Sequence, residues 1–584
     1  MEGDIQKKLL RGFSQKALQM SSSCSCTGVM AFLSGALVSF LLLAASTYRT
    51  SDKSMEVGLS FSVPATTQDV KFRRNQIPKE MGCNSLPKEA ENGADSDRST
   101  DQKLSLLYSM WSSQLHQAPS KDYTFWSKQG LNQSDIPKAP HIENCKLSII
   151  KNKKLDSYGE NGTFPHWSLW KGYLGLELHP PTLQLGGGRQ LGHHGGSEPV
   201  FPPWVEGSDV DNLPSTRTVQ RDLWMHQHPR NCRDPQTRFL LADWEREPGF
   251  GIGAQIAGMV GLLSIAIGEK RVLVTKYFNR ADHEGCQGMS RSHWSCYFFP
   301  ETSAECQEQA FELAKMQDAW KNGTITSKEN YTSKEIWAGR VPRVWGNPWD
   351  EMQPTTEISG NLVKNHRKMD RRWWRAQAVR YLMRFQSEYT CELLNIARHE
   401  AFGTQAAKLV LETLPAEWPK VSEAKLRSEM EKYVWSNYKP WVPRPLLSIH
   451  VRMGDKACEM EVFGFEAYIR LADRIRSYFP NLKDIWLSSE MQEVIDKSKS
   501  YTQWNFHYTN VTRQVGNITM ATYEASIGRR TSTDYPFVNF LMAAEADFFI
   551  GALGSTWCFL IDGMRSTGGK VMAGYVSVNK DRFW

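Results

Sequence analysis

The sequence holds only one hydrophobic run long enough to cross a bilayer, and it carries little excess charge of either sign. Seventy Lys and Arg residues against 63 Asp and Glu residues leave a net charge of +7 over 584 residues. The scarcity of long apolar runs excludes a polytopic membrane protein. With 40% hydrophobic and 23% charged residues, the chain is not disordered or collagen-like as a whole. No internal repeat of fixed short period is present.

The single long apolar run lies near the N-terminus. Residues 27–47 are about 21 uncharged residues, close to the ~20 that a membrane-spanning helix needs. A cleaved signal peptide is the alternative, but its apolar core is usually shorter. Four basic residues precede the run, so the positive-inside rule places the N-terminus in the cytosol. We therefore predict a cytosolic tail over 1–26, a transmembrane signal-anchor over 27–48 and a luminal remainder.

The cysteines and glycosylation sequons fit a luminal chain. Cys24 and Cys26 lie on the cytosolic side of the run, where they are free thiols or palmitoylation sites. The other nine of the 11 cysteines fall in the luminal part, so at least one of them has no partner within the chain. Six N-x-S/T sequons agree with a secretory route. They are Asn132, Asn161, Asn322, Asn330, Asn510 and Asn517.

The luminal part begins with two regions that lack a clear periodicity of apolar residues. Residues 49–104 are polar without a sustained apolar period, which predicts a flexible stem. Residues 105–231 are rich in Trp, Gly, Pro and His and form an irregular region. The adjacent His193 and His194 there lack matching carboxylates or cysteines, so we expect no metal site.

An α/β pattern becomes legible after residue 231. It falls into two blocks, 232–440 and 441–584, each with strands that alternate with helices. Two such blocks in series predict an α/β protein with two Rossmann-like halves facing a cleft.

The net charge is concentrated in the first block. Residues 364–384 hold eight basic residues against one acid, an excess equal to that of the whole chain. Trp373, Trp374, Tyr381 and Leu382 recur at helical spacing and predict a buried face. The arginines are then expected on the other side, either as a solvated charge run or as a surface for an acidic glycan, a phosphate-bearing donor or a membrane. A luminal protein meets no nucleic acid.

Three motifs suit phosphate binding. Gly251 and Gly253 lie in a loop between a strand and a helix, where backbone N–H groups approach phosphate, although a tight structural turn is an equal alternative. His450 and Arg452 alternate onto one face at the end of a buried strand. Arg452 could then bind a diphosphate with help from Lys456, or form a salt bridge in the turn.

The third motif is a small hydroxyl-bearing turn. Ser555 and Thr556 follow the strand 546–552 and precede an apolar helix, so they either hold phosphate or cap that helix.

The order of four motifs is similar to that of a known family. The motifs GFGIGAQ (249–255), WWRAQAVRYLMRF (373–385), HVRMGDK (450–456) and ADFFIGALGSTWC (546–558) together resemble the catalytic domain of α-1,6-fucosyltransferases. The resemblance covers about 232–565. It implies a GT-B-like fold, GDP-fucose as the donor, inversion at the anomeric carbon and no metal or other cofactor.

The resemblance also assigns roles. His450 matches the histidine that contacts guanine, Arg452 the essential arginine on the diphosphate, Lys456 a lysine of the catalytic site and Asp455 an acid of the same loop. Gly251, Gly253, Ser555 and Thr556 match the two phosphate turns. The resemblance further implies a Cys232–Cys306 disulfide, and Cys286–Cys296 is a second, local candidate.

Three positions depart from the family pattern. The second of two adjacent arginines is Met453, and the guanine-binding aspartate is Asn539, which lacks the charge. The general base is a Glu in the family, and that position here is Met460, flanked by Glu459 and Glu461. One of these two must take the acceptor proton, and we favour Glu459 because the following segment is one residue shorter than in the family.

The resemblance therefore implies a single-pass type II glycosyltransferase of the Golgi membrane that transfers fucose from GDP-fucose to a glycan. Protein O-fucosylation and fucosylation of a cell-wall polysaccharide are alternatives with a different acceptor. A catalytically inactive nucleotide- or glycan-binding protein is the alternative from another class. The sequence leaves the acceptor, the linkage and the oligomeric state open.

Overall fold

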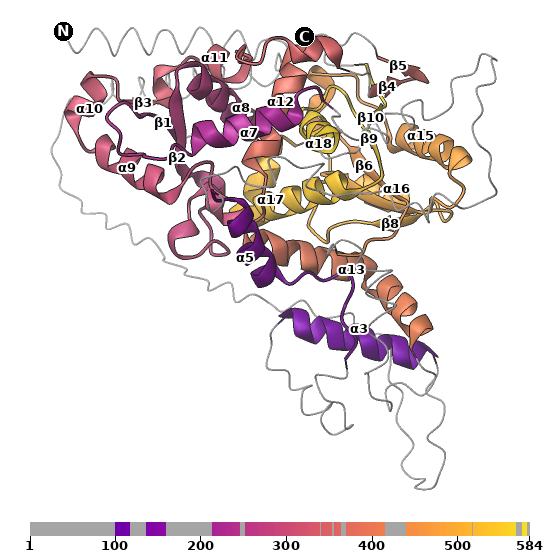
Figure 1. Ribbon diagram of the computed structural model, residues 1–584. Coiled ribbons are helices and arrows are strands. Elements are labelled where there is room, and N and C mark those ends of the chain that lie inside the picture. The colour runs from indigo at the N-terminus through magenta and orange to yellow at the C-terminus, as the bar shows by residue number, and fades with distance from the viewer. Residues whose placement is uncertain are drawn as a thin grey trace, which may run out of the picture. The chain divides into compact units, whose positions relative to one another are not determined.

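In the computed structural model, all the described residues belong to one compact unit, Arg98–Trp584 (Figure 1). The predicted span, the stem up to residue 99, the residues 364–368, His193, His194 and the sequons Asn132, Asn161 and Asn517 lie outside the described residues. The end of the predicted stem, 100–104, is helical instead, and the region 105–231, predicted to be irregular, also contains helices. Within the described ranges, no helix is both long and apolar enough to cross a membrane. These ranges are 100–116, 136–158, 213–245, 251–338, 340–352, 356–363, 369–414, 440–516, 518–567 and 575–580.

The first sheet is small and parallel. Its strand order is β2-β1-β3, and β1 (Arg238–Trp244) pairs with β2 (Arg271–Phe278) and β3 (Ile325–Ser327). Helix α8 (Ile252–Gly268) connects β1 to β2 and is buried along most of its length, since it is built from Ala, Gly and large aliphatic residues. The remaining helices of this block are α7 (Thr216–Gln227), α9 (Ala304–Ala314), α10 (Gln317–Lys321) and α11 (Ser333–Ala338).

The second sheet has seven strands in the order β5-β4-β10-β9-β6-β7-β8. All its pairs are parallel except β4–β5. Strands β6 and β9 are buried at every residue, as is typical of parallel strands covered on both faces. The strands are β4 (Thr356–Ile358), β5 (Asn361–Leu362), β6 (Leu446–Val451), β7 (Asp484–Ser489), β8 (Asn505–His507), β9 (Phe548–Gly551) and β10 (Tyr575–Ser577).

The two predicted blocks share this second sheet. Strand β4 comes from the N-terminal block in sequence, yet it pairs with β10 near the C-terminus. The expected α/β class is confirmed. The helices around the second sheet are α12 (Met369–Leu382), α13 (Glu388–Thr413), α15 (Phe465–Tyr478), α16 (Gln492–Ser498), α17 (Met520–Glu545) and α18 (Thr556–Ser566).

Helix α17 is longer than the sequence pattern predicts. The apolar pattern before the strand 546–552 predicts a helix only near 534–545, whereas α17 starts after the cap Thr519 and contains a break at Gly528, where φ is 79°. A glycine tolerates this left-handed value, so the chain bends there without steric cost. The first half of α17 thereby reaches back to the first sheet's loops.

Several arginines of α12 and of the residues that follow it are buried, which contradicts the expected exposed basic face over residues 364–384. Nη2 of Arg372 lies 2.6 Å from Oδ2 of Asp562, and Nε of Arg384 lies 2.8 Å from Oδ1 of Asp156. Arg380 is also buried and donates to a backbone carbonyl of α18. The prediction was wrong for these arginines because their acidic partners are more than 180 residues away in sequence and leave no trace in the local period.

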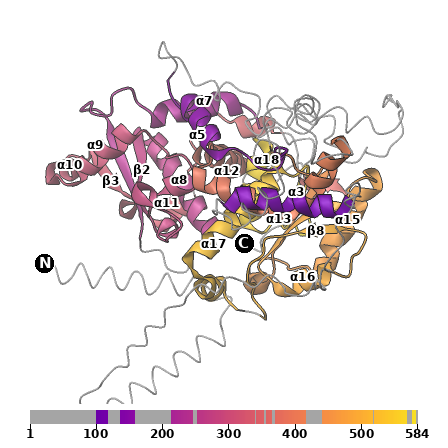
Figure 2. The same ribbon diagram turned by 90° about the horizontal axis from the view of Figure 1, so that it is seen from below.

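Two short helices at the start of the described chain attach to α13. Figures 1 and 2 both show α3 (Thr100–His116) lying against α13. Ser112 Oγ lies 2.6 Å from Nε2 of His399, whose Nδ1 lies 2.9 Å from Nε2 of His141. Helix α5 (Cys145–Leu155) follows and also contacts α13.

Three disulfides are present among the described residues. One was not predicted: Cys145–Cys391 joins α5 to α13 across a sequence separation of 246 residues. Both expected pairs form, Cys232–Cys306 and Cys286–Cys296.

The sequons within the described ranges are accessible. Asn322, Asn330 and Asn510 are all exposed, as attachment of a glycan requires.

Candidate functional site

Three neighbouring strands of the second sheet end at one edge. Strand β6 lies between β7 and β9, all parallel, and His450 pairs in register with Ser488. The residues that follow each strand therefore emerge together, at the place where α/β proteins bind ligands. The structure thus brings the His450–Arg452 motif next to the turn at Ser555.

The guanidinium of Arg452 lies between two carboxylates. Its Nη1 donates to Oε1 of Glu490, and its Nη2 donates to Oδ1 of Asp455 over 2.8 Å. Burial opposes the charge on Arg452, but Glu490 and then Asp455 outweigh it and raise the pKa above its ordinary value. Arg452 is therefore a fixed, permanent cation at the strand edge, and the salt bridge that the sequence offered as its alternative role is also formed.

His450 presents an unpaired ring nitrogen. Its Nδ1 lies 3.0 Å from Oγ of Ser488, whereas its Nε2 is buried and has no hydrogen-bond partner among the described residues. Burial, with the nearby Arg452, lowers the pKa of His450 to about 4, against an opposing effect of Glu490. The ring is therefore neutral at pH 7. A buried polar atom without a partner is uncommon in native proteins and marks a position where a ligand can bind.

The glycine loop of the first sheet reaches this cluster through the start of α17. The backbone N–H of Met520 donates to Oδ2 of Asp455 over 3.3 Å. A Cβ added at Gly251 would lie 3.9 Å from Cγ of Met520, and one at Gly253 would lie 3.3 Å from the ring of Trp557. Gly251 and Gly253 therefore lie beside both the Arg452 loop and the first turn of α18.

The turn at Ser555 leaves a helix N-terminus open. Ser555 occupies the position before α18, but its side chain makes no capping hydrogen bond. The amide of Gly554 donates to Oδ1 of Asn579 over 3.2 Å. The first turn of a helix carries N–H groups without intrahelical partners and a positive end of the dipole, which favour an anion. The alternative interpretation, in which the Ser555 side chain caps α18, is therefore wrong.

Lys456 and Glu459 form a close pair. Nζ of Lys456 lies 2.5 Å from Oε1 of Glu459, and each side chain is about a quarter exposed, at 26% and 25%. Glu461 is exposed, and its backbone carbonyl accepts from Nδ2 of Asn579. Both acids thus lie beside the site, and only Glu459 is tied to the lysine.

Met460 explains the departure from the family pattern at the base position. Its side chain is 1% exposed and packs so closely against Gly554 that a Cβ there would lie 2.7 Å from it. The methionine therefore fills space under the Ser555 turn. A carboxylate at this position would be buried, and the acids on either side of it are not.

The side chain of Asn539 forms two hydrogen bonds with other side chains of the protein. Its Oδ1 accepts from Nε1 of Trp486 over 3.0 Å, and its Nδ2 donates to Oγ1 of Thr509 over 3.4 Å. The indole thus takes one of the two hydrogen bonds that Oδ1 of Asn539 can accept.

Sequence reasoning missed Glu490. It follows β7 directly and is 4% exposed, with Oε1 also accepting from the amide of Met453 over 3.1 Å. The signal was present, because an acid directly after the strand DIWLSS belongs at the same edge as Arg452. Among the described residues, no group of three or more His, Cys, Asp or Glu side chains is arranged to hold a metal ion.

The fold can be compared with solved structures. Those that show likeness at low sequence identity include the following three. A mutant of Arabidopsis thaliana FUT1 in complex with GDP has 10% identity and a TM-score of 0.28, over 62% of this chain and 74% of that one. NodZ α-1,6-fucosyltransferase with GDP has 12% identity and a TM-score of 0.26, over 55% and 90%. POFUT1 in complex with GDP-fucose has 13% identity and a TM-score of 0.24, over 59% and 99%.

Likeness at these TM-scores carries no argument about activity. No protein-family model matches the chain, and no curated protein sequence matches it. The functional case therefore rests on the residues of the site.

Proposed function

We propose that this protein is a glycosyltransferase with a GT-B-like arrangement that transfers fucose from GDP-fucose to a glycan hydroxyl. The carrying observation is the pair formed by a buried fixed cation, Arg452, and a buried ring nitrogen without a partner, Nε2 of His450, at one sheet edge. A nucleoside diphosphate supplies the partner that this ring nitrogen lacks and a diphosphate group for the fixed cation. Its phosphates bind the guanidinium, and its base offers a hydrogen bond to the neutral imidazole.

The chemical step follows from the same geometry. The acceptor oxygen attacks the anomeric carbon and forms the new C–O bond, while the bond from that carbon to the β-phosphate oxygen breaks. Glu459 takes the acceptor proton, and the electron pair leaves with GDP. The guanidinium of Arg452, the amides after Gly251 and the N-terminus of α18 stabilise the charge that develops on the diphosphate. Attack opposite to the leaving group inverts the anomeric carbon, and no metal or other cofactor takes part.

The acceptor is a separate question. The resemblance in motif order supports an α-1,6-linked glycan product, and a protein hydroxyl and a cell-wall polysaccharide are the other acceptors. A binding-only role has one specific observation in its favour, which is the engagement of Asn539 by Trp486. Oδ1 of Asn539 then has one acceptor position left for a guanine N–H, without the charge of an aspartate.

The cellular setting belongs to the same proposal. The run over 27–47 and the basic residues before it support a single-pass type II protein of the Golgi membrane, with the described unit in the lumen. The exposed Asn322, Asn330 and Asn510 are compatible with glycans on that unit.

Calorimetric titration with GDP-fucose, GDP-mannose and UDP-galactose, followed by a donor-turnover assay on a glycan panel, tests the function. We expect GDP-fucose to bind and Arg452→Ala to abolish both binding and turnover. Binding without turnover on any acceptor supports the binding-only role. Absence of GDP binding, or full activity in Arg452→Ala, overturns the proposal.

A further inference from the structure

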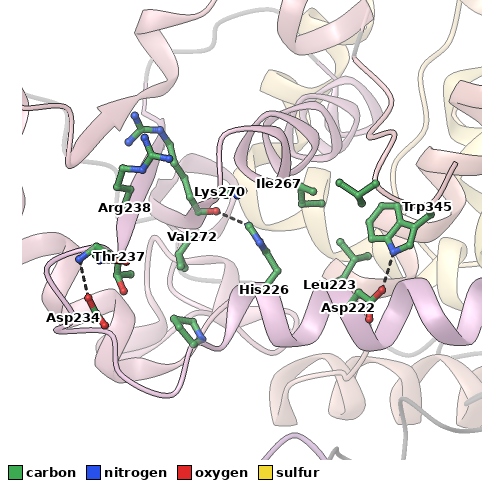
Figure 3. Close-up of a pocket in the computed structure, with 14 residues that line it drawn as sticks. Asp222, Leu223, His226, Asp234, Thr237, Arg238, Ile267, Lys270, Val272 and Trp345 are labelled. Carbon is green, nitrogen blue, oxygen red and sulfur yellow. Dashed lines mark hydrogen bonds between the residues drawn. The ribbon is translucent and has the colours of Figure 1, made fainter.

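A cavity of about 560 Å³ lies at the other end of the first sheet (Figure 3). Its walls come from α7, from the loop before β1, from the turn between α8 and β2, and from the loop at Trp345. Arg238 begins β1, whereas Gly251 follows its carboxyl end. A strand of seven residues spans about 23 Å. The cavity is therefore too far away to be filled by a nucleotide that binds at Arg452.

One side of the cavity is apolar. Leu223, Ile267 and the indole of Trp345 lie together on this side (Figure 3). Nε1 of Trp345 donates to Oδ2 of Asp222 over 2.9 Å, which fixes the ring. Val344 at the same wall is 66% exposed, an aliphatic side chain that no other part of the described chain covers. An aromatic ring with aliphatic neighbours suits the C–H face of a sugar ring.

The opposite side carries polar groups of both kinds. Asp234, Thr237, Arg238 and Lys270 lie there (Figure 3). The Lys270 ammonium forms no ion pair or hydrogen bond with any residue that the structure describes, and its backbone holds a left-handed φ of 54°. Donors and acceptors side by side match hydroxyl groups, each of which both donates and accepts.

The charges that line the cavity are of both signs. Asp222 and Asp234 lie in the same lining as Arg238, Lys270 and Arg271, and Nε of Arg271 is paired with Oε2 of Glu269. The C-terminal end of α8 and the C-terminal half of α7 also border the cavity, and helix C-termini carry a partial negative charge. Because no single sign of charge dominates, a neutral ligand with many hydroxyl groups fits the cavity.

We infer that this cavity is a second carbohydrate site, which binds a neutral oligosaccharide independently of the nucleotide-sugar site. Cavities of this size hold small organic ligands. Because the site lies beyond reach of the reacting carbon, it holds saccharide in place without taking part in transfer. The inference goes beyond the proposed transferase activity and does not depend on it.

Saturation-transfer NMR on the full chain in a zwitterionic, sugar-free detergent tests the inference with chitotriose, cellotriose and xylotriose as probes. Val344→Glu places a charge in the apolar wall, and Lys270→Asn removes the ammonium while it tolerates the positive φ. Met289→Glu and Lys321→Gln are matched controls, because those side chains are exposed and do not line the cavity. GDP affinity and the melting temperature are measured for all four variants.

We expect at least one trisaccharide to bind in the presence of saturating GDP, and both cavity variants to weaken that binding at least tenfold. The two controls retain saccharide binding, and all four variants retain the wild-type affinity for GDP. The inference is overturned if no trisaccharide binds, if GDP displaces the saccharide, or if the cavity variants bind as the wild type does. Loss of GDP binding alone counts against the proposed function and leaves this inference standing.

Discussion

Arg372 and Asp562 form an ion pair in the protein interior that holds α12 against α18. Their side chains are 7% and 5% exposed, and Nη2 lies 2.6 Å from Oδ2. A pair so deeply buried is costly to break on one side only, since the remaining charge then has no partner.

Replacing Arg372 with Gln should therefore lower the free energy of unfolding by about 3–5 kcal/mol, measured by denaturant titration. Arg340→Gln is the control, because Arg340 is 84% exposed and its contact with Glu335 is 4.0 Å long. The control should change stability by less than about 0.5 kcal/mol. Equal effects of the two substitutions would contradict a structural role for the buried arginine.

The substitution Glu490→Gln tests whether Glu490 holds the guanidinium of Arg452 in its orientation. The amide keeps the shape of the side chain but removes the charge that fixes the guanidinium from one side. We expect GDP affinity to fall about tenfold, or roughly 1.4 kcal/mol, because Arg452 loses its fixed orientation. Glu493→Gln, on the exposed side of the neighbouring α16, is the matched control. An unchanged affinity in Glu490→Gln would mean that Asp455 alone holds the arginine.

Glu459→Gln and Glu461→Gln distinguish the two acids next to Met460. Loss of a general base typically slows turnover by about 10²–10⁴-fold, with donor binding retained. We expect this loss for Glu459, which lies against Lys456, and near wild-type rates for Glu461. The reverse pattern in a single-turnover assay would move the base to Glu461.

Buried histidines predict a loss of stability in acid. Burial lowers the pKa of His450 and of His228 to about 4, with Arg452 and Arg384 adding to the effect, and burial lowers that of His141 to about 3. Between the ordinary value of 6.5 and about 4, the unfolded chain binds protons that the folded chain does not. The free energy of unfolding therefore rises with pH across this window and falls as the pH drops through it.

Each of these sites contributes a slope of at most about 1.4 kcal/mol per pH unit. Denaturant titrations at pH 6.5, 5.5 and 4.5 measure the total slope, and His450→Asn should reduce it by the share of one site. Stability that stays constant or increases toward pH 4.5 would refute this account.

The sequence predicted the site better than it predicted the surface. Strand endings are local, so the alternation of His450 and Arg452 and the turn at Ser555 were legible, and parallel pairing of β6, β7 and β9 brought them together. The departures at Met460 and Asn539 were also visible as residue types. Their causes, packing against Gly554 and engagement by Trp486, are tertiary contacts that no local pattern encodes.

The charge pattern led to a wrong prediction because an arginine can be buried when an acidic partner lies next to it, and that partner can be far away in sequence. We predicted that the arginines of α12 form a solvent-exposed face, because charged residues rarely lie in the core without a partner. Asp562 pairs with Arg372 of α12, and Asp156 pairs with Arg384, which follows α12; the two acids come from opposite ends of the described part of the chain. Strand β4 could not be predicted for a similar reason. Its three residues show no strand period of their own, and the strand forms by pairing with β10, which is distant in sequence.

The Cys145–Cys391 bond joins positions that enclose nearly half of the chain. A single protease cut anywhere between those positions leaves two fragments that remain one molecule until a reductant is added. On a non-reducing gel such a nicked chain runs near full mass, and its site residues from 450 onward stay tethered to α5. Intact mass under oxidising conditions is therefore no evidence of an uncut chain.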